Sequence, residues 1–445
     1  MKEIRWLKRH VAVPALLAAL VTIGAIGMDI YSRKDAEVIE LKDLTGNRSE
    51  LADIRIKGEY TDGYHTTSFQ IGDGKVAKST KLRAQPVAEQ PYRYNPGMPK
   101  RIGEFEYEVM DIQPTIKIRV RKMNSTGPYA SIILNAAASA SDPSTVGTTT
   151  THYANVQEYG LTVGNGKLYF TLPITRAYKG STGIYEWNLD DLRFKRVAEE
   201  SPLEARTVAE WPLVSEQENP GEAMDVIGLE AVGNSLALVA MQGDKLVVRG
   251  YDSASGKVSG EARIAMSGTP IAGERAQAGK PAIEARLNES YQAFSDPEAG
   301  TLTLAFHESS DPVGEWGMKI YSFDLSSGVK LVNETRVVYP DQLKSDTFFG
   351  YTSMAYRNGK LYMAQLLWDR RDLESDQTFT FSQPRIFLID VYRNNEHRYE
   401  GELKSDMNQD MNQDYARISN PANLDYQFRT FNHVSFQSAS REEQP

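Results

Sequence analysis

The chain has 445 residues, of which 50 are Lys or Arg and 59 are Asp or Glu, so its formal net charge is −9. Apolar residues make up 40% and charged residues 24%, a composition typical of globular proteins rather than disordered or fibrous ones. The acidic balance argues against nucleic acid as a partner, because proteins that bind it carry a basic stripe. The absence of cysteine excludes disulfides, thiolate metal sites, iron–sulfur clusters and cysteine nucleophiles.

The amino-terminal segment has the features of a membrane anchor. An uncharged, mostly apolar run from Val11 to Met28 follows four basic residues, Lys2, Arg5, Lys8 and Arg9. As a helix rising about 1.5 Å per residue, this run reaches roughly 27 Å, close to the thickness of the hydrocarbon layer of a bilayer. The basic flank favours a cytoplasmic amino terminus and an exported remainder.

A cleaved signal peptide is the alternative, since Ala25-Ile26-Gly27 is a passable small-x-small cleavage site. We expect residues 1–34 to be a cytoplasmic stub with a single-pass anchor, or else a signal peptide. Residues 35–445 are then an extracytoplasmic domain of a cell-membrane protein.

A short pattern recurs along the chain: a β-branched residue, two variable residues, a bulky apolar residue, and then Asp or Asn. Five copies start at intervals of 64, 64, 72 and 66 residues, at Val120, Ile184, Val248, Ile320 and Ile386. In four of the five units, a β-rich segment before the pattern follows or overlaps a turn signal such as Asn165-Gly166 or Asn358-Gly359. Asn-Gly between such runs is the strongest short-range signal for a hairpin. Each unit therefore predicts a four-stranded antiparallel meander.

The pattern also predicts details within the units. In the unit from 156 to 197 we expect strands at residues 156–163, 166–172, 183–189 and 193–197. Three aspartates end third strands, where a short carboxylate can accept backbone N–H groups of the following turn; these are Asp252, Asp324 and Asp390.

Four-stranded units that repeat without intervening helices are typical of a β-propeller. Tandem sandwiches need about seven strands per domain, and solenoids normally repeat at 20 to 50 residues, so both fit less well. The fold class is therefore all-β, a propeller of about six four-stranded blades, or seven, preceded by an N-terminal transmembrane helix. We expect the first blade within residues 36–85 and a strand at 425–436 that pairs with it.

The units within residues 100–400 resemble blades of the broad pyrroloquinoline-quinone-like and WD-like propeller superfamily. The tryptophan-docking signature of the quinone enzymes is absent, and so is the Gly-His to Trp-Asp pairing of WD repeats. The resemblance therefore implies an architecture for a membrane-anchored bacterial envelope protein, with no cofactor and no particular partner.

All the long, irregular segments are expected at one edge of the sheets. In an antiparallel meander, the connections between the second and third strands leave from the same edge as the connections between units, which we call the long-loop edge. Loops on a rigid scaffold are where binding residues concentrate, although solvated spacers are an equal alternative. The segments concerned are residues 136–155, 173–182, 198–224, 265–289, 308–317, 369–384 and 403–423.

Five residues of these segments are candidate binding residues: Trp368, Arg370, Arg371, Trp316 and Trp211. A Trp offers a stacking face to a sugar or a cation, and Arg can clamp a carboxylate or phosphate. The first three lie within 368–374 among three carboxylates, so a self-neutralising surface loop is the alternative. Trp316 lies near His307-Glu308, which could supply a metal ligand or an acid and base. Trp211 lies in a segment expected to be a loop. We expect it either to bind a partner or glycan or to fill part of the hydrophobic core.

Other chemical motifs are weak or absent. Residues 406–414 superficially resemble a calcium loop, but Met411 and Arg417 stand where such a loop needs Gly and Glu. The chain has no phosphate-binding glycine loop, no Gly-x-Ser-x-Gly elbow and no His-Glu-x-x-His motif. We therefore predict no catalytic residue, no metal site and no cofactor.

The function predicted from these features is binding. We expect a membrane-anchored extracytoplasmic propeller that serves as a binding or sensory module for an envelope protein or glycan ligand. The alternative is a cell-surface carbohydrate-active enzyme whose acidic residues at the long loops act as acid and base.

Overall fold

The structure is a computed structural model, which describes the chain in these ranges: residues 12–33, 38–61, 65–72, 75–82, 100–102, 105–113, 115–122, 132–137, 160–171, 181–189, 205–212, 224–266, 291–309, 316–339, 343–345, 352–369, 385–405 and 430–439. Within these ranges the protein is mostly β, with 26 strands in six antiparallel sheets. One helix, α2 (Ala12–Arg33), and one 3₁₀ turn, η1 (Arg48–Leu51), complete the described elements. The predicted all-β class is confirmed.

The helix α2 lies where the apolar run predicted a helix. Its large apolar side chains are exposed, namely Leu16, Leu17, Leu20, Val21, Ile23, Ile26 and Met28. By length and hydropathy, no helix in the described part of the chain qualifies as a membrane span. The predicted transmembrane helix is therefore not found, although a helix is.

The chain forms two compact units. The first comprises residues 1–90, 373–389 and 399–445, and the second comprises residues 91–372 and 390–398. The strands β24 (Arg385–Arg393) and β25 (Glu396–Ser405) are each continuous and contribute residues to both units.

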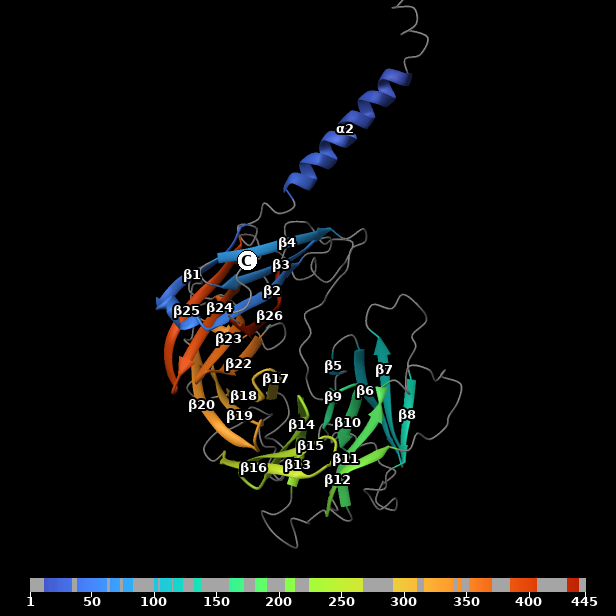
Figure 1. The fold of residues 1–445 in the computed structure, drawn as a ribbon, viewed down its shortest axis with the longest axis vertical. Coiled ribbons are helices and arrows are strands. Elements are labelled where there is room, and N and C mark those ends of the chain that lie inside the picture. Colours follow the sequence, from blue (N-terminus) through green and yellow to red (C-terminus); the bar gives the residue numbers. More distant parts are fainter. Residues whose placement is uncertain are drawn as a thin grey trace, which may run out of the picture. The chain divides into compact units, whose positions relative to one another are not determined.

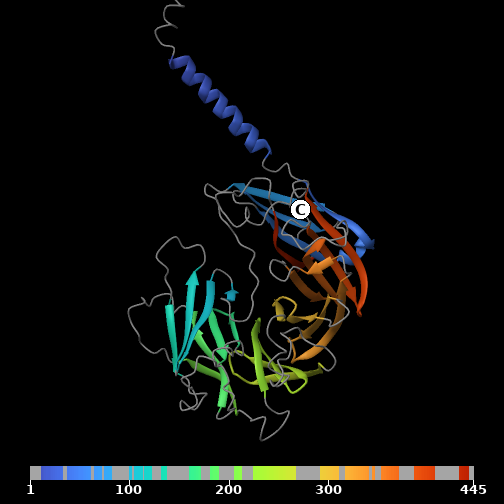
Figure 2. The ribbon, with the colours of Figure 1, turned by 180° about the vertical axis from the view of Figure 1, so that it is seen from behind.

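Four sheets of the second unit follow one another in chain order, and each is a four-stranded antiparallel meander (Figure 1). Figure 2 shows the same strands from behind. Sheet 2 contains β5 (Lys100–Ile102), β6 (Phe105–Gln113), β7 (Thr115–Lys122) and β8 (Ile132–Ala137). Sheet 3 contains β9 (Leu161–Gly164), β10 (Lys167–Thr171), β11 (Ser181–Asn188) and β12 (Arg206–Pro212). Sheet 4 contains β13 (Met224–Val232), β14 (Ser235–Gln242), β15 (Lys245–Asp252) and β16 (Val258–Ala265). Sheet 5 contains β17 (Tyr291–Asp296), β18 (Thr301–Ser309), β19 (Trp316–Asp324) and β20 (Lys330–Tyr339).

The first and last sheets each include a strand from the opposite end of the chain. Sheet 1 has the order β26-β2-β3-β4, so the C-terminal strand pairs with β2; its strands are β2 (Ile54–Thr61), β3 (His65–Gly72), β4 (Lys75–Leu82) and β26 (Thr430–Ser438). This confirms the expected pairing of the tail with the first sheet, and the strands expected there between residues 52 and 82, whereas residues 39–46 of the expected range 36–85 belong to sheet 6. Sheet 6 joins β24 and β25 to β21 (Leu343–Ser345), β22 (Thr352–Arg357) and β23 (Lys360–Asp369), with β1 (Ile39–Gly46) paired to β25. The sequence did not predict the contribution of β1.

The Asn-Gly turns are formed as predicted. Asn165 and Gly166 have φ of 51° and 73°, and Asn358 and Gly359 have φ of 52° and 74°. Positive φ at both central residues is what a two-residue hairpin turn requires, and Asn and Gly tolerate it. These turns therefore determine the register between the first and second strands of sheets 3 and 6.

Two of the three predicted strand-ending aspartates hold turns. An Oδ1 oxygen of Asp252 accepts the N–H of Ser255 at 2.7 Å, and Asp324 accepts the N–H of Ser326 at 2.8 Å. The prediction is wrong for Asp390, which lies within β24 and is 3% exposed. The reason is that β24 continues to a turn at Asn394-Asn395, where both residues have positive φ, so no side-chain cap is needed at Asp390.

The fourth strand of sheet 3 was predicted in the wrong place. Its position is β12, which pairs with β11 from Ser181↔Pro212 to Glu186↔Arg206, rather than residues 193–197. The segment 198–224 is thus not one connecting loop, because it contains this strand. The expectation placed the fourth strand a few residues after the third, whereas β12 begins at Arg206, 18 residues after β11 ends at Asn188.

The core forms where adjacent sheets pack on one another. On β14, Leu236 and Leu238 pack in a cluster with residues of sheet 3, whereas Val239 and Met241 pack in a cluster with residues of sheet 5. Alternate side chains of a strand point to opposite faces, so both faces of sheet 4 are buried. Gly256, at φ 69°, lies so close to the carbonyl oxygen of Val208 that a Cβ would overlap it. This glycine allows the last turn of sheet 4 to approach sheet 3.

We predict that Asp324→Ala lowers the free energy of unfolding by about 1 kcal/mol, the usual magnitude for a lost capping bond. Asp324→Asn should retain most of the stability, because its amide oxygen still accepts the N–H of Ser326. Hydrogen bonds from the side chain and backbone of Ser326 lower the pKa of Asp324. The contribution is therefore full above the ordinary aspartate range and is lost as the pH falls through the lowered pKa. Urea unfolding of the three proteins at pH 7 and pH 3 measures this; equal losses for Ala and Asn would contradict it.

Candidate functional site

The three candidate tryptophans lie on three different sheets of the second unit. Trp211 lies on β12 opposite Thr182, and Trp316 begins β19 opposite Ser309. Trp368 is the penultimate residue of β23, opposite Lys344 of β21. In each sheet this is the edge from which the connection between the second and third strands leaves. The register therefore places all three at the long-loop edge of their own sheets, as the sequence predicted.

Trp211 lies in a strand, not in the predicted loop. Its ring stacks on Tyr251 of sheet 4, with ring centroids 6.1 Å apart and an interplanar angle of 25°. It also packs on the cluster that includes Val226 and Leu229. Its Nε1–H is buried and finds no hydrogen-bond partner among the described residues. This environment favours the alternative that Trp211 plugs the core between two sheets.

The other candidates are placed only in part. The backbone of Trp316 and Trp368 is described, and their side chains lie outside the described residues. Arg370 and Arg371 also lie outside the described residues, as do residues 406–414. The backbone of His307 and Glu308 pairs with that of Met318 and Gly317 next to Trp316. The expectation of a binding role for these residues remains a prediction.

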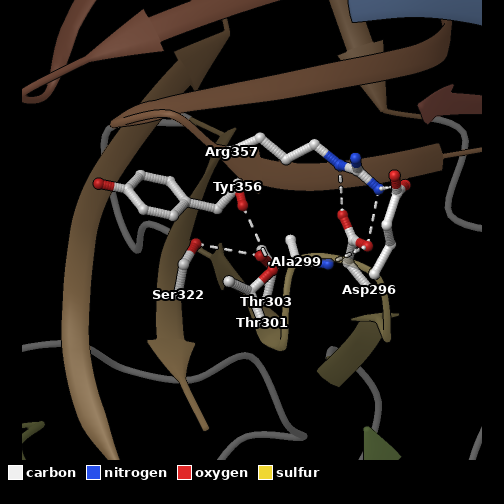
Figure 3. Close-up of polar contacts among 8 residues, drawn as sticks. Asp296, Ala299, Thr301, Thr303, Ser322, Tyr356 and Arg357 are labelled. Carbon is white, nitrogen blue, oxygen red and sulfur yellow. Dashed lines mark hydrogen bonds and ion pairs between the residues drawn. The ribbon is translucent and has the colours of Figure 1, made fainter. Parts of the chain in front are cut away.

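The best-defined polar site of the second unit lies at the opposite edge, where the tight turns are. Arg357, the last residue of β22, forms a two-pronged ion pair with Asp296, the last residue of β17 (Figure 3). Its Nε donates to Oδ2 at 2.5 Å and its Nη2 to Oδ1 at 2.8 Å. Nη2 also donates to Glu298 Oε2 at 2.8 Å. Two parallel N–H to oxygen bonds give this pair both strength and a single geometry.

Burial and charge act against each other on this arginine. Arg357 is 7% exposed and Asp296 is 9% exposed. Burial by itself lowers the pKa of Arg357, but hydrogen bonds and charge from Glu298 and Asp296 raise it above its usual value. The guanidinium is therefore charged at all ordinary pH values and neutralises the buried carboxylate.

Neutral hydrogen bonds continue the link between sheets 5 and 6 (Figure 3). The hydroxyl of Thr301 donates to the carbonyl oxygen of Tyr356 at 3.2 Å, and the hydroxyl of Tyr356 donates to the carbonyl oxygen of Val332 at 3.0 Å. The hydroxyls of Thr303 and Ser322 lie 3.0 Å apart within sheet 5. Every partner here is a structural group of the same two sheets. These contacts therefore stabilise the packing of sheet 5 against sheet 6. They do not present an acid and a base to a substrate.

A second charged cluster joins sheets 3 and 4 at the same type of edge. Glu186 is 7% exposed and accepts bonds from Arg206 Nε at 2.5 Å and Lys167 Nζ at 2.9 Å. Burial raises the pKa of Glu186, but hydrogen bonds from Arg206 and Lys167 outweigh it and lower the pKa below its usual value. Arg206 also reaches the carbonyl oxygen of Ser253 in sheet 4 at 3.4 Å.

Sequence reasoning missed both clusters. Arg357 and Asp296 are 61 residues apart, and only the packing of sheet 5 against sheet 6 brings them together. A signal did exist, because Asp296 and Arg357 each end the first strand of a four-stranded meander, just before a turn that the sequence predicted. Residues of opposite charge at the ends of the first strands of neighbouring meanders are therefore the signal of such a contact.

The comparisons with known proteins place the chain in no family. No family model and no curated protein matches it. A structure from a study of two prolyl endopeptidases is 11% identical with a TM-score of 0.25, covering 88% of this chain and 60% of that one. A GH43 endo-arabinanase from Bacillus licheniformis is 10% identical with a TM-score of 0.27, covering 66% of this chain and 92% of that one. This chain thus spans 60% of the length of the endopeptidase, and similarities this low carry no argument about activity.

We predict that Arg357→Met destabilises the protein by about 3 to 5 kcal/mol, because it leaves a buried carboxylate without its counter-ion. The matched control is Arg263→Met, which removes an ion pair with Glu261 from an arginine side chain that is 47% exposed. This control should cost less than about 1 kcal/mol. Guanidinium unfolding monitored by tryptophan fluorescence gives both values. Similar small losses for the two variants would show that the Arg357 pair does not hold the sheets together.

Proposed function

We propose that the protein is a six-bladed β-propeller outside the cytoplasm that serves as a binding or sensory module for a protein or ligand at the cell envelope. The six sheets are its blades. Support comes from the four consecutive meanders and from the exchange of terminal strands, with β26 in sheet 1 and β1 in sheet 6. Such pairing fits a ring of sheets, because it ties each end of the chain to the sheet formed by the other end, and propellers leave only short, protected edges.

The observation that carries the binding proposal is the placement of Trp316 and Trp368 at the long-loop edge of two sheets. Tryptophan and arginine supply much of the energy at typical interfaces, and Arg370 and Arg371 follow Trp368 directly in sequence. In this proposal the ligand contacts these four residues. Trp211 has a structural role between sheets 3 and 4, where it stacks on Tyr251.

Attachment to the membrane is a separate part of the proposal. The apolar side chains of α2 between Leu16 and Met28 are 54–78% exposed, and water is an unfavourable surrounding for so continuous an apolar surface. The basic residues before the helix favour the cytoplasmic side. We propose that the segment before residue 36 holds the propeller at the membrane.

The alternative function is a surface enzyme acting on a polysaccharide. It requires two carboxyl groups roughly 5 to 10 Å apart facing a sugar. Glu308 at the long-loop edge is one candidate in the described backbone. The test is to incubate the protein with plant or bacterial polysaccharides. If the wild type hydrolyses one of them and Glu308→Gln does not, the enzyme proposal replaces the binding proposal.

For the binding site, we expect Trp368→Ala and the double variant Arg370→Ala, Arg371→Ala to abolish capture of a ligand that the wild type retains. The two assays are a glycan array and cross-linking to envelope proteins. Thermal unfolding should change little, because exposed substitutions usually move stability by less than about 0.5 kcal/mol. Arg263→Ala, on the outer strand of sheet 4, is the control and should bind like the wild type. A large loss of stability in Trp368→Ala would assign this residue to the core instead.

For the membrane, we expect the full-length protein to remain in the membrane fraction after carbonate extraction. A variant that starts at residue 36 should be soluble, because it lacks the exposed apolar helix. Western blots of the two fractions measure the distribution. Recovery of a mature form beginning near Met28 from the medium would instead show that the segment is a cleaved signal peptide.

A further inference from the structure

The hairpin of β24 and β25 brings together a histidine and two carboxylates for which the sequence predicted no role. Asp390 lies on β24, and His397 and Glu400 lie on β25. The strands are joined by Asn394 and Asn395, whose φ values are 52° and 61°. A two-residue turn of this kind fixes the register of the strands that it joins.

The three side chains converge. Nε2 of His397 lies 2.9 Å from Oδ1 of Asp390. One ligand atom from each of Asp390, His397 and Glu400 lies within 4.8 Å of the other two. The hairpin thus brings one imidazole and two carboxylates within reach of a single point.

Neighbouring side chains hold two of the donors in position. Asp390 is 3% exposed, and its second oxygen, Oδ2, accepts a hydrogen bond from Nε2 of Gln365 at 3.1 Å. The ring of Tyr392 stacks on that of His397, with centroids 4.8 Å apart and an interplanar angle of 26°. A hydrogen bond that orients a carboxylate, as Gln365 does here, is typical of the outer groups of metal sites.

We propose that Asp390, His397 and Glu400 bind one divalent transition-metal ion, of which Zn²⁺ is the best match. One imidazole and two carboxylates are donors that zinc accepts, whereas calcium and magnesium prefer oxygen donors alone. Tetrahedral bonds of about 2.0 to 2.2 Å separate donor atoms by roughly 3.3 Å. The Asp390 and His397 donors are 2.9 Å apart, close to this value, and all three donors lie within 4.8 Å, so side-chain rotation has to bring them onto the ion, which replaces the hydrogen bond between Asp390 and His397. A fourth position remains for water or a ligand.

The site does not depend on the propeller or binding proposals, since it lies within one hairpin and a strand next to it in the same sheet. Its effect is to cross-link the two strands of the hairpin. An ion that binds the folded protein and not the unfolded chain also raises the unfolding temperature.

The test uses the full-length, tag-free protein, stripped with a chelator and titrated with Zn²⁺ by calorimetry. We expect one site per chain that His397→Gln weakens at least 100-fold. The matched control, His433→Gln, changes an exposed histidine on β26 and should bind like the wild type. Gln365→Met should weaken zinc about tenfold, the usual effect of removing an outer hydrogen bond.

Several results would overturn the proposal: no binding by the wild type, equal binding of Mg²⁺ and Zn²⁺, or equal loss in the His397 and His433 variants. Circular dichroism of each variant without metal checks that it is folded. If His397→Gln fails to fold, Glu400→Gln replaces it, because Glu400 is only partly buried. Unchanged zinc affinity in a folded Glu400→Gln protein would overturn the three-donor site.

Discussion

The structure depends on one constraint, which is that the strands β14, β18 and β23 of sheets 4, 5 and 6 are buried on both faces. In sheet 4, the middle strand β14 is buried from Leu236 to Met241 without interruption, although alternate side chains point to opposite faces. Such a sheet cannot remain in water alone and must be covered on each side by another sheet. Successive sheets of the chain supply that cover, and each burial contributes free energy in proportion to the apolar area removed from water. Close packing then demands Gly256 at the point where a turn of one sheet meets a strand of the next.

Apolar packing has little directional preference, so the polar contacts between sheets carry the specificity of alignment. Among the described residues of the second unit they gather at the edge with the tight turns. The side-chain amide of Asn165 donates to the carbonyl oxygen of Gly233 at 3.2 Å between sheets 3 and 4, and Arg357 bonds to Asp296 between sheets 5 and 6. Buried pairs of this kind contribute little net stability compared with apolar packing, but they penalise every arrangement that leaves one charge alone. Among the described residues, these tight-turn contacts are structural ones between neighbouring sheets.

The hairpin of sheet 6 differs from the others in what its polar residues do. Asp252 and Asp324 end their strands and hold backbone N–H groups, whereas the corresponding Asp390 is buried beside Gln365 and His397. The two-residue turn at Asn394-Asn395 is the cause, because positive φ at both residues reverses the chain without help from a side chain. An aspartate that is not needed for the turn is available for another role.

The sequence by itself determined the local structure: the period of about 66 residues, the Asn-Gly turns, the β-rich segments between them, and the strand near the C-terminus that completes sheet 1. These are decided within a few residues by backbone conformation and by the alternation of side chains. It placed Trp316 and Trp368 at the correct edge for the same reason, since strand order alone settles that. Only the tertiary structure decided that β1 pairs with β25, that Trp211 stacks on Tyr251, that Arg357 meets Asp296 and that Asp390 meets His397. Most of these contacts join residues 40 or more positions apart. The last joins side chains across a hairpin in which the strand extends beyond Asp390, where the pattern had ended it. The packing of whole sheets, rather than any local pattern, sets which side chains face each other.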